Sequence, residues 1–80
     1  MRTITDEHGQ TWEAVAIPVK VAHLRDGAQL AFRPAGDPAG VVSAPIDFNS
    51  MQAADFAIRT MSEKELRRRL DWAKTAAGVV

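Results

Sequence analysis

The stretch IDFNSMQAADFAIRTMSEKEL, residues 46–66, contains the point at which the apolar pattern of the chain changes its period. Up to Phe48, apolar and polar residues alternate as in a half-buried β-strand. Beyond Asn49, the apolar residues recur at helical spacing and fall within about 80° of a helical wheel: Met51, Ala54, Ile58 and Met61. The sequence therefore predicts strands first and helices second, which is the order of an α+β domain.

Both predicted helices carry their own start signals. Asn49 or Ser50 can cap the first helix, because a side-chain oxygen at this position accepts a hydrogen bond from a free backbone N–H of the first turn. Ser62 and Glu65 have the spacing of a capping box at the start of the second helix. The apolar residues of that helix form a narrow inward stripe: Leu66, Leu70, Ala73 and Ala77. The joint between the helices is therefore expected to be short.

The residues before Asn49 are expected to form the sheet. Asp6–Gly9 has the composition of a hairpin turn, and the Asp-Gly pair within Arg25–Ala28 is the clearest turn signal in the chain. Two prolines and two glycines in Pro34–Gly40 predict a loop. These breaks divide the segment into about four antiparallel strands, which form a β-meander.

Two prolines fall inside the predicted strands. Proline has no backbone N–H to donate to a ladder, so Pro18 marks a bend, a bulge or an edge, and Pro45 indicates that the last strand is an edge. We expect one small α+β domain over residues 1–80, with the β-meander in 1–48 and a two-helix unit in 49–80. Both helices are expected to pack on one face of the sheet.

Composition excludes several classes of protein. With 80 residues, 46% hydrophobic and 25% charged, the chain is too short for two domains and too apolar to be disordered. It has no cysteine, which excludes disulfides and thiolate metal sites and favours a reducing compartment. No segment approaches a signal peptide or the roughly 18 apolar residues of a membrane span, so the sequence predicts a cytoplasmic protein. Ten basic and ten acidic residues leave no net field toward nucleic acid or lipid.

The densest charge lies in the second predicted helix, where Arg67, Arg68 and Arg69 follow one another. Consecutive helical residues are about 100° apart, so the three side chains spread over about 200° and cannot enter one groove together. Each arginine has an acidic residue within one turn. The expected pairs are Glu63 with Arg67, Glu65 with Arg69, and Arg68 with Asp71. The pattern indicates a helix face that is exposed to water and stabilised by ion pairs.

A second interpretation of the same helix is a nucleic-acid-binding regulator. Two short helices joined by a three-residue turn also form the skeleton of helix-turn-helix readers, in which Arg67, Arg68 and Lys74 could contact phosphates. Glu63 and Glu65 would occupy the first turn of the helix that enters the groove, where their carboxylates repel phosphates. Protein binding is therefore the preferred interpretation, and nucleic-acid binding is the alternative.

The aromatic residues point to a binding surface. Trp12 lies on a strand beside the first turn and is expected in the core. Trp72 lies about 120° from Leu66 on the helical wheel, outside the apolar stripe, so it either rests against the sheet or is exposed. Phe56 lies opposite the main stripe of its own helix. With Ala76, these two rings would form an apolar patch larger than a lone small domain normally shows.

The expected function follows from that surface. We expect a non-enzymatic protein–protein interaction domain or accessory subunit, whose partner can be another copy of itself. The expected interface residues are Phe56, Arg69 and Trp72, with Arg68 as a charge at the rim, because tryptophan and arginine are enriched at interface hot spots. The sheet edge near Val42–Phe48 is a secondary place, where a partner strand could be added.

No catalytic residue, cofactor or metal site is expected. His8 stands beside Asp6 and Glu7, and His23 stands near Asp26, but extended chain between the two histidines would span roughly 40 Å. Both are expected to be exposed turn residues, with a metal or small ligand at the first turn as a distant third possibility. The chain has neither a glycine-rich phosphate loop nor a nucleophile elbow. Its Gly-x-x-Trp, Leu-x-Phe and Glu-Leu-x-x-x-Leu elements are common among small bacterial proteins and specific to no family.

Overall fold

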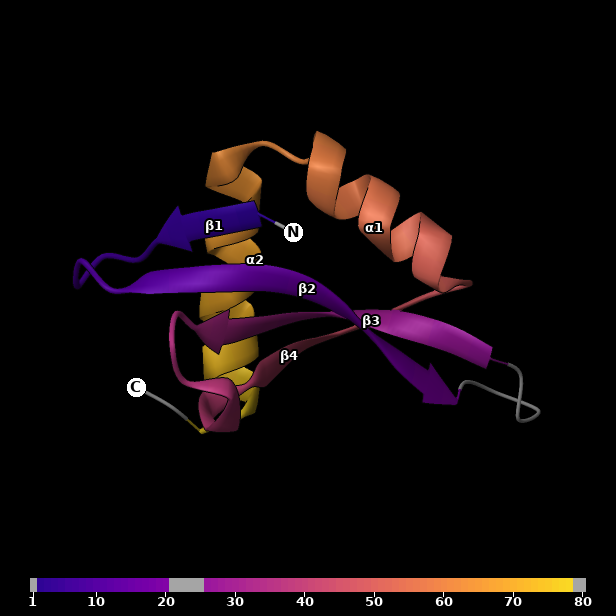
Figure 1. The fold of residues 1–80 in the computed structure, drawn as a ribbon, viewed down its shortest axis with the longest axis horizontal. Helices are drawn as coiled ribbons and strands as arrows, with labels where there is room; N and C mark the ends of the chain where they lie inside the picture. The colour runs from indigo at the N-terminus through magenta and orange to yellow at the C-terminus, as the bar shows by residue number, and fades with distance from the viewer. Residues whose placement is uncertain (1, 21–25, 79–80) are drawn as a thin grey trace.

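The computed structural model describes residues 2–20 and 26–78, which form a four-stranded antiparallel sheet followed by two helices (Figure 1). The strands lie in chain order: β1 (Arg2–Thr5), β2 (Thr11–Lys20), β3 (Asp26–Pro34) and β4 (Val42–Phe48). The helices are α1 (Met51–Thr60) and α2 (Glu63–Ala76), and a short 3-10 turn, η2 (Pro38–Gly40), lies in the loop before β4. The predicted α+β class, with a β-meander before two helices, is confirmed.

One face of the sheet carries the core. Residues at even positions of the strands point to this inner face, and both helices add side chains to the same buried cluster. Its members are Ile4, Trp12, Ala14, Leu30, Phe32, Val42, Ala44, Ile58, Leu66, Leu70 and Ala73. Trp12 is 4% exposed, which confirms its expected place in the core. The helices therefore cover one face, as predicted.

The helix starts are those that the sequence predicts. The hydroxyl of Ser50 accepts a hydrogen bond of 3.1 Å from the backbone N–H of Ala53, and Ser50 rather than Asn49 is the cap of α1. The hydroxyl of Ser62 accepts one of 3.1 Å from the N–H of Glu65 at the start of α2. These caps set where each helix begins. None of the helices in the described part of the chain is long and apolar enough to cross a membrane.

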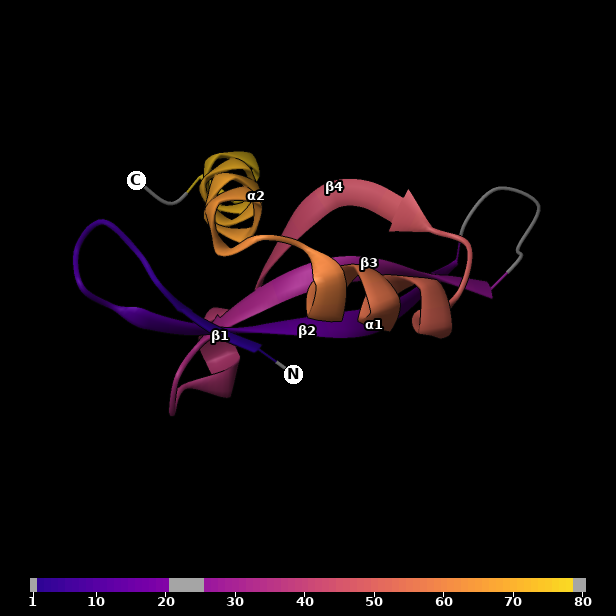
Figure 2. The same cartoon turned by 90° about the horizontal axis from the view of Figure 1, so that it is seen from above.

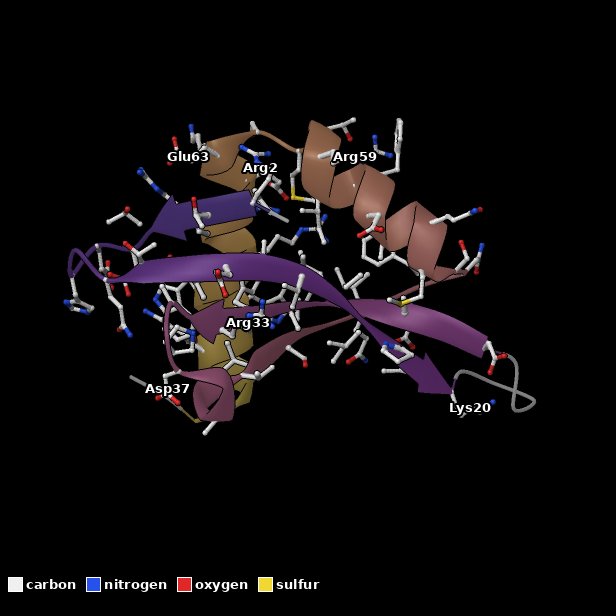
Figure 3. The ribbon with its side chains drawn as sticks, in the orientation of Figure 1. Arg2, Lys20, Arg33, Asp37, Arg59 and Glu63 are labelled. Atoms are coloured by element: carbon white, nitrogen blue, oxygen red, sulfur yellow. The ribbon has the colours of Figure 1, made fainter. Side chains whose placement is uncertain are left out.

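Helix α1 packs over the parts of β2 and β3 that lie beyond β1. β1 pairs only with residues 11–14 of β2, and α1 follows it at that end of the sheet (Figures 1 and 2). Arg2 joins the two elements: its guanidinium donates to the carbonyl oxygen of Ile58 at 3.2 Å and to that of Met61. Figure 3 shows Arg2 where β1 and the end of α1 meet. Carbonyls that would lack a partner at the helix end are thus satisfied.

The second hairpin differs from its prediction. Asp26 and Gly27, expected in the turn, lie in β3, where they pair with Lys20 and Val19 of β2. Asp26 forms an ion pair with Lys20 across the strands, which extends the ladder beyond the Asp-Gly signal. Residues 21–25, which include Arg25 of the predicted turn, lie outside the described residues. Pro18 does not interrupt β2 but pairs in register with Ala28, on the part of the strand that β1 does not reach.

Strand β4 is an edge of the sheet, as Pro45 indicates, and its pairing is irregular. Gln29 is opposite Asp47 and Ala31 is opposite Ser43, so one residue of β3 faces three residues of β4 around the proline. A shift of two residues keeps the inward positions of β4 on the inner face, because side chains alternate with a period of two. The same irregularity makes the outer edge of β4 a poor template for an added strand.

Candidate interaction surface

The side of α2 that carries Trp72 is turned away from the core. Leu66, Leu70 and Ala73 are buried against the sheet, whereas the indole of Trp72 remains 46% exposed. Arg69 lies one turn earlier on the same side of the helix, and its guanidinium contacts the carboxylate of Glu65 at 3.2 Å. The sequence allowed Trp72 either to rest against the sheet or to be exposed, and the structure shows it partly exposed.

Phe56 forms a separate exposed feature on α1. Its ring is 60% exposed, and the guanidinium carbon of Arg59 lies 6.0 Å from the ring centroid, at the outer limit of a cation–π contact. Figure 3 shows Arg59 on the outer side of α1. The C-terminal half of α2, which carries Trp72, lies away from α1 in both views of the fold (Figures 1 and 2). The single patch expected from Phe56, Trp72 and Ala76 is therefore divided into two.

The arginine run is paired along the helix. Arg67 lies 3.4 Å from Glu63, and both Arg68 and Arg69 reach Glu65, at 3.5 and 3.2 Å. Two of the three expected pairs are present, and Arg68 pairs with Glu65 on the preceding turn instead of the expected Asp71. The reason is geometric, because helical side chains tilt toward the N-terminus and therefore reach backward more readily than forward. Arg68 is the most exposed of the three, at 79%.

Lys74 takes part in a nearly buried contact that the sequence analysis missed. Its ammonium group donates to Oδ2 of Asp6 at 2.9 Å, and the two side chains are 12% and 2% exposed. The indole Nε1 of Trp12 donates to the same oxygen at 2.9 Å, and the ammonium lies 5.1 Å from the Trp12 ring centroid. The backbone N–H groups of His8 and Gln10 each donate to Oδ1 of Asp6 at 2.9 Å. One carboxylate thus connects the first hairpin turn to the last turns of α2.

These contacts govern the ionisation of Asp6. Burial alone would raise the pKa of its carboxyl group, but the hydrogen bonds from Lys74, Trp12 and the two backbone N–H groups lower that pKa well below its ordinary range. Asp6 is therefore charged at neutral pH although almost no water reaches it. A buried tryptophan N–H needs an acceptor, and this was the signal in the sequence that could have pointed to Asp6.

The three residues that were predicted to bind nucleic acid already contact carboxylates, some more closely than others. Lys74 is committed to Asp6, and Arg67 and Arg68 each lie beside a glutamate. A phosphate would have to compete with these carboxylates, so the arrangement gives the alternative little support. It stays a prediction that binding experiments can test.

A metal or ligand site at the first turn, the third possibility raised by the sequence, has little support from the described residues. His8 is 70% exposed, and its Nε2 lies 3.5 Å from Glu7. His23 lies outside the described residues. Within residues 2–20 and 26–78, no cluster of three potential metal ligands is present, and no buried side-chain polar atom lacks a partner. An open hollow of about 520 Å³ lies near the start of α1. Its lining residues are Pro18, Val19, Lys20, Asp26, Gly27, Ser50 and Met51.

No family model, curated protein or solved structure matches this chain. The function has to be inferred from what the surface presents. Among the described residues, the features available are the exposed Trp72 with its neighbouring arginines, the exposed Phe56 with Arg59, and the uncovered face of the sheet.

Removing the Asp6 carboxylate is expected to destabilise the fold strongly. Asp6→Ala leaves a nearly buried ammonium and three N–H donors without their acceptor, which should cost about 3 kcal/mol of unfolding free energy. That is a large part of the roughly 4 to 12 kcal/mol expected for a domain of this size. Urea denaturation followed by circular dichroism measures the change. Asp26→Ala is the matched control: Asp26 is 87% exposed, so losing its ion pair with Lys20 should leave the unfolding free energy almost unchanged. Equal losses in the two variants would contradict the role given to Asp6.

Acid should remove the same contribution. Because the pKa of Asp6 is lower in the folded protein than in the unfolded chain, where its ordinary value is 3.8, the carboxylate stabilises the fold above that value. This stability is lost as the pH falls from about 4 toward the lower folded pKa. We expect the unfolding free energy to fall more steeply below pH 4 in the wild type than in Asp6→Asn, when both are measured by urea denaturation. Parallel pH profiles would contradict it.

Nucleic-acid binding is expected to be weak or absent. At about 50 mM salt, a fluorescent mixed-sequence duplex DNA or RNA should show no saturable anisotropy change at micromolar protein, because Arg67, Arg68 and Lys74 already lie beside carboxylates. Saturable binding with a slope of log K against log salt of about −2 or steeper would reverse the order of the two interpretations. In that case Arg68→Ala should make the slope shallower by about one.

Proposed function

We propose that this chain is a small protein–protein interaction domain, an accessory subunit that acts by binding and not by catalysis. Its primary contact surface is the flank of α2 that presents Trp72, Arg69 and Arg68. The observation that carries the proposal is the 46% exposure of the Trp72 indole on a helix whose two leucines, Leu66 and Leu70, are fully buried. A tryptophan left exposed beside arginine is the combination most enriched among residues that dominate binding energy.

The arrangement around Trp72 favours binding in two ways. Arg69 is 22% exposed and already held by Glu65, so less side-chain entropy is lost when it contacts a partner. Arg68, at 79% exposure, can act at the rim, where a charge affects the association rate more than the affinity. Trp72 would supply the apolar anchor, Arg69 an oriented donor, and Arg68 the outer charge.

Two other surfaces have less support as the primary contact. Phe56 is more exposed than Trp72, but the guanidinium of Arg59 lies 6.0 Å from its ring centroid, at the limit of a cation–π contact, so we assign Phe56 to a secondary contact on α1. The edge of β4 is irregular around Pro45, which disfavours the addition of a partner strand. We also propose a cytoplasmic location, supported by the absence of cysteine in an 80-residue domain that a disulfide would otherwise help to stabilise.

Truncating the indole is the direct test of this proposal. Trp72→Ala should weaken binding to the partner by about 2 kcal/mol or more, a loss of roughly 30-fold, because it removes the anchor from the centre of the contact. The melting temperature should change little, since nearly half of the side chain is already in water. A partner isolated with the wild-type protein as bait would be purified and titrated by calorimetry against both forms.

Val41→Ala is the matched control. Val41 is also an exposed apolar residue, at 43%, but it lies before β4 and outside the proposed contact. It should bind the partner as tightly as the wild type does. If Trp72→Ala and Val41→Ala bind equally well, the flank of α2 is not the contact surface.

A further inference from the structure

The face of the sheet opposite the helices is uncovered in the described part of the chain. In Figure 1, α2 lies behind the sheet, and in Figure 2 the short η2 turn and its loop project on the opposite side of β2 and β3, at one end of the strands. We call this side the outer face. Its residues lie at odd positions of the strands: Thr3, Glu13, Val15, Ile17, Val19, Gln29, Ala31, Arg33, Ser43 and Asp47.

Strand β2 is apolar on this face as well as on the inner one. Ala14 and Ala16 point to the core, whereas Val15, Ile17 and Val19 alternate with them on the outer face. An antiparallel sheet with one wet face normally carries polar residues there, and a nearly continuous apolar run is typical of a strand covered on both sides. The outer side of β2 therefore has the composition of a surface that a second layer covers.

We propose that a second copy of this chain covers the outer face, in a two-fold dimer whose axis runs parallel to the strands between β2 and β3. Such an axis places each outer residue of β2 above the residue that pairs with it in β3, but in the other copy. The register fixes these pairs: Glu13 with Arg33, Val15 with Ala31, Ile17 with Gln29, and Val19 with Gly27.

The sizes of the side chains suit this arrangement. Val15 would lie opposite Ala31 of the second copy, and Val19 opposite Gly27, so each branched side chain is aligned with a small residue. Ala31 is 0% exposed because its neighbours on the face enclose it, so Val15 of the second copy would rest on those neighbours. The row of larger side chains on β2 can then fit over the lower row on β3, with the two sheets about 10 Å apart.

The charges are also self-complementary. Glu13 and Arg33 form an ion pair of 2.6 Å within one copy, and their side chains are 22% and 38% exposed. The proposed axis places Glu13 of one copy against Arg33 of the other, so that four charges of alternating sign meet. The loop that contains η2 borders this end, where a hollow of about 270 Å³ lies beside the pair. Asp47 pairs with Gln29, at the level of Ile17, and so lies several rungs away from this group of charges.

The size of the face sets the expected affinity. β1 does not extend beyond residue 14 of β2, so over most of the rungs from Glu13 to Val19 the face is three strands wide. A width of about 14 Å and a length of about 20 Å give a projected area of roughly 300 Å² per copy. Standard stable interfaces bury about 1,200 Å² or more in total. The dimer is therefore expected to be weak, with a dissociation constant in the micromolar range.

Sedimentation velocity from about 5 to 500 µM tests the proposal. The weight-average mass of the wild type should rise from that of a monomer toward twice that value. Ile17→Lys, which places an ammonium group at the centre of the face, should weaken dimerisation at least about 20-fold while leaving the circular dichroism spectrum unchanged. Trp72→Ala should dimerise like the wild type, because α2 lies on the opposite side of the sheet.

A charge exchange tests the orientation of the two copies. Glu13→Arg should weaken dimerisation by about tenfold or more, because it brings like charges together both within and between copies. The double variant Glu13→Arg with Arg33→Glu restores alternating charges and should dimerise within about threefold of the wild type. This pair of variants decides the matter even if Ile17→Lys fails to fold.

Three results would overturn the proposal. The first is a wild type that stays monomeric at 500 µM, the highest concentration of the series, which is on the order of the weakest specific contacts. The second is a dimer that both Ile17→Lys and Glu13→Arg leave intact. The third is a dimer that Trp72→Ala abolishes, which would place self-association on α2. The first two leave the proposed role of the α2 flank standing, because that role is measured with a different partner and a different variant.

Discussion

The contact between Asp6 and Lys74 is the one on which the arrangement of the helices depends. It joins residues that are 68 positions apart in the chain, and the sequence has no cysteine with which to form a disulfide cross-link instead. A nearly buried ion pair adds little net stability compared with apolar packing, but leaving either charge unpaired is costly. It therefore fixes how α2 is rotated on the sheet. Lys74 and Trp72 lie about 200° apart around the helix, so turning Lys74 toward the first hairpin turns Trp72 toward solvent.

The sheet protects its edges in two different ways. On one side, β1 is short, and Arg2 ties it to the end of α1, which packs over the neighbouring part of β2. On the other side, the irregular pairing around Pro45 disturbs the ladder of β4. Exposed edges invite pairing with other chains, and both devices discourage it. What remains for specific association is the flank of α2 and the outer face, and these lie on opposite sides of the sheet.

The sequence predicted the features that depend on neighbouring residues. The change of period at Asn49 placed both helices, and the caps at Ser50 and Ser62 were found because a cap acts over three residues. Contacts between distant segments could not be predicted in this way. The Asp-Gly signal at residues 26 and 27 was overridden by pairing with Lys20 and Val19, and the partner of Lys74 lies at the other end of the chain.

One clue to the buried lysine was nevertheless present. On the helical wheel, Lys74 lies only about 40° from Leu70, at the border of the apolar stripe, whereas Arg68 lies far outside it. A cation in that position is expected to be drawn into the packing, and it then needs a carboxylate. The sequence was sufficient to name Phe56, Arg69 and Trp72 as candidate interface residues. It could not show that Phe56 lies on a separate patch, because the distance between α1 and the C-terminal half of α2 is a property of the fold.

The two proposed surfaces are compatible in one assembly. Each copy has its outer face on one side of the sheet and α2 on the other, so a dimer through the outer faces would leave both α2 flanks on the outside, facing away from each other. With two helices and two sheets between them, the Trp72 side chains would be separated by roughly 30 Å. One partner could then engage both flanks only if it spanned that distance, whereas two separate partner molecules could bind without hindrance. Such a dimer would bring two partners together, which is a coherent role for an accessory subunit without chemistry of its own.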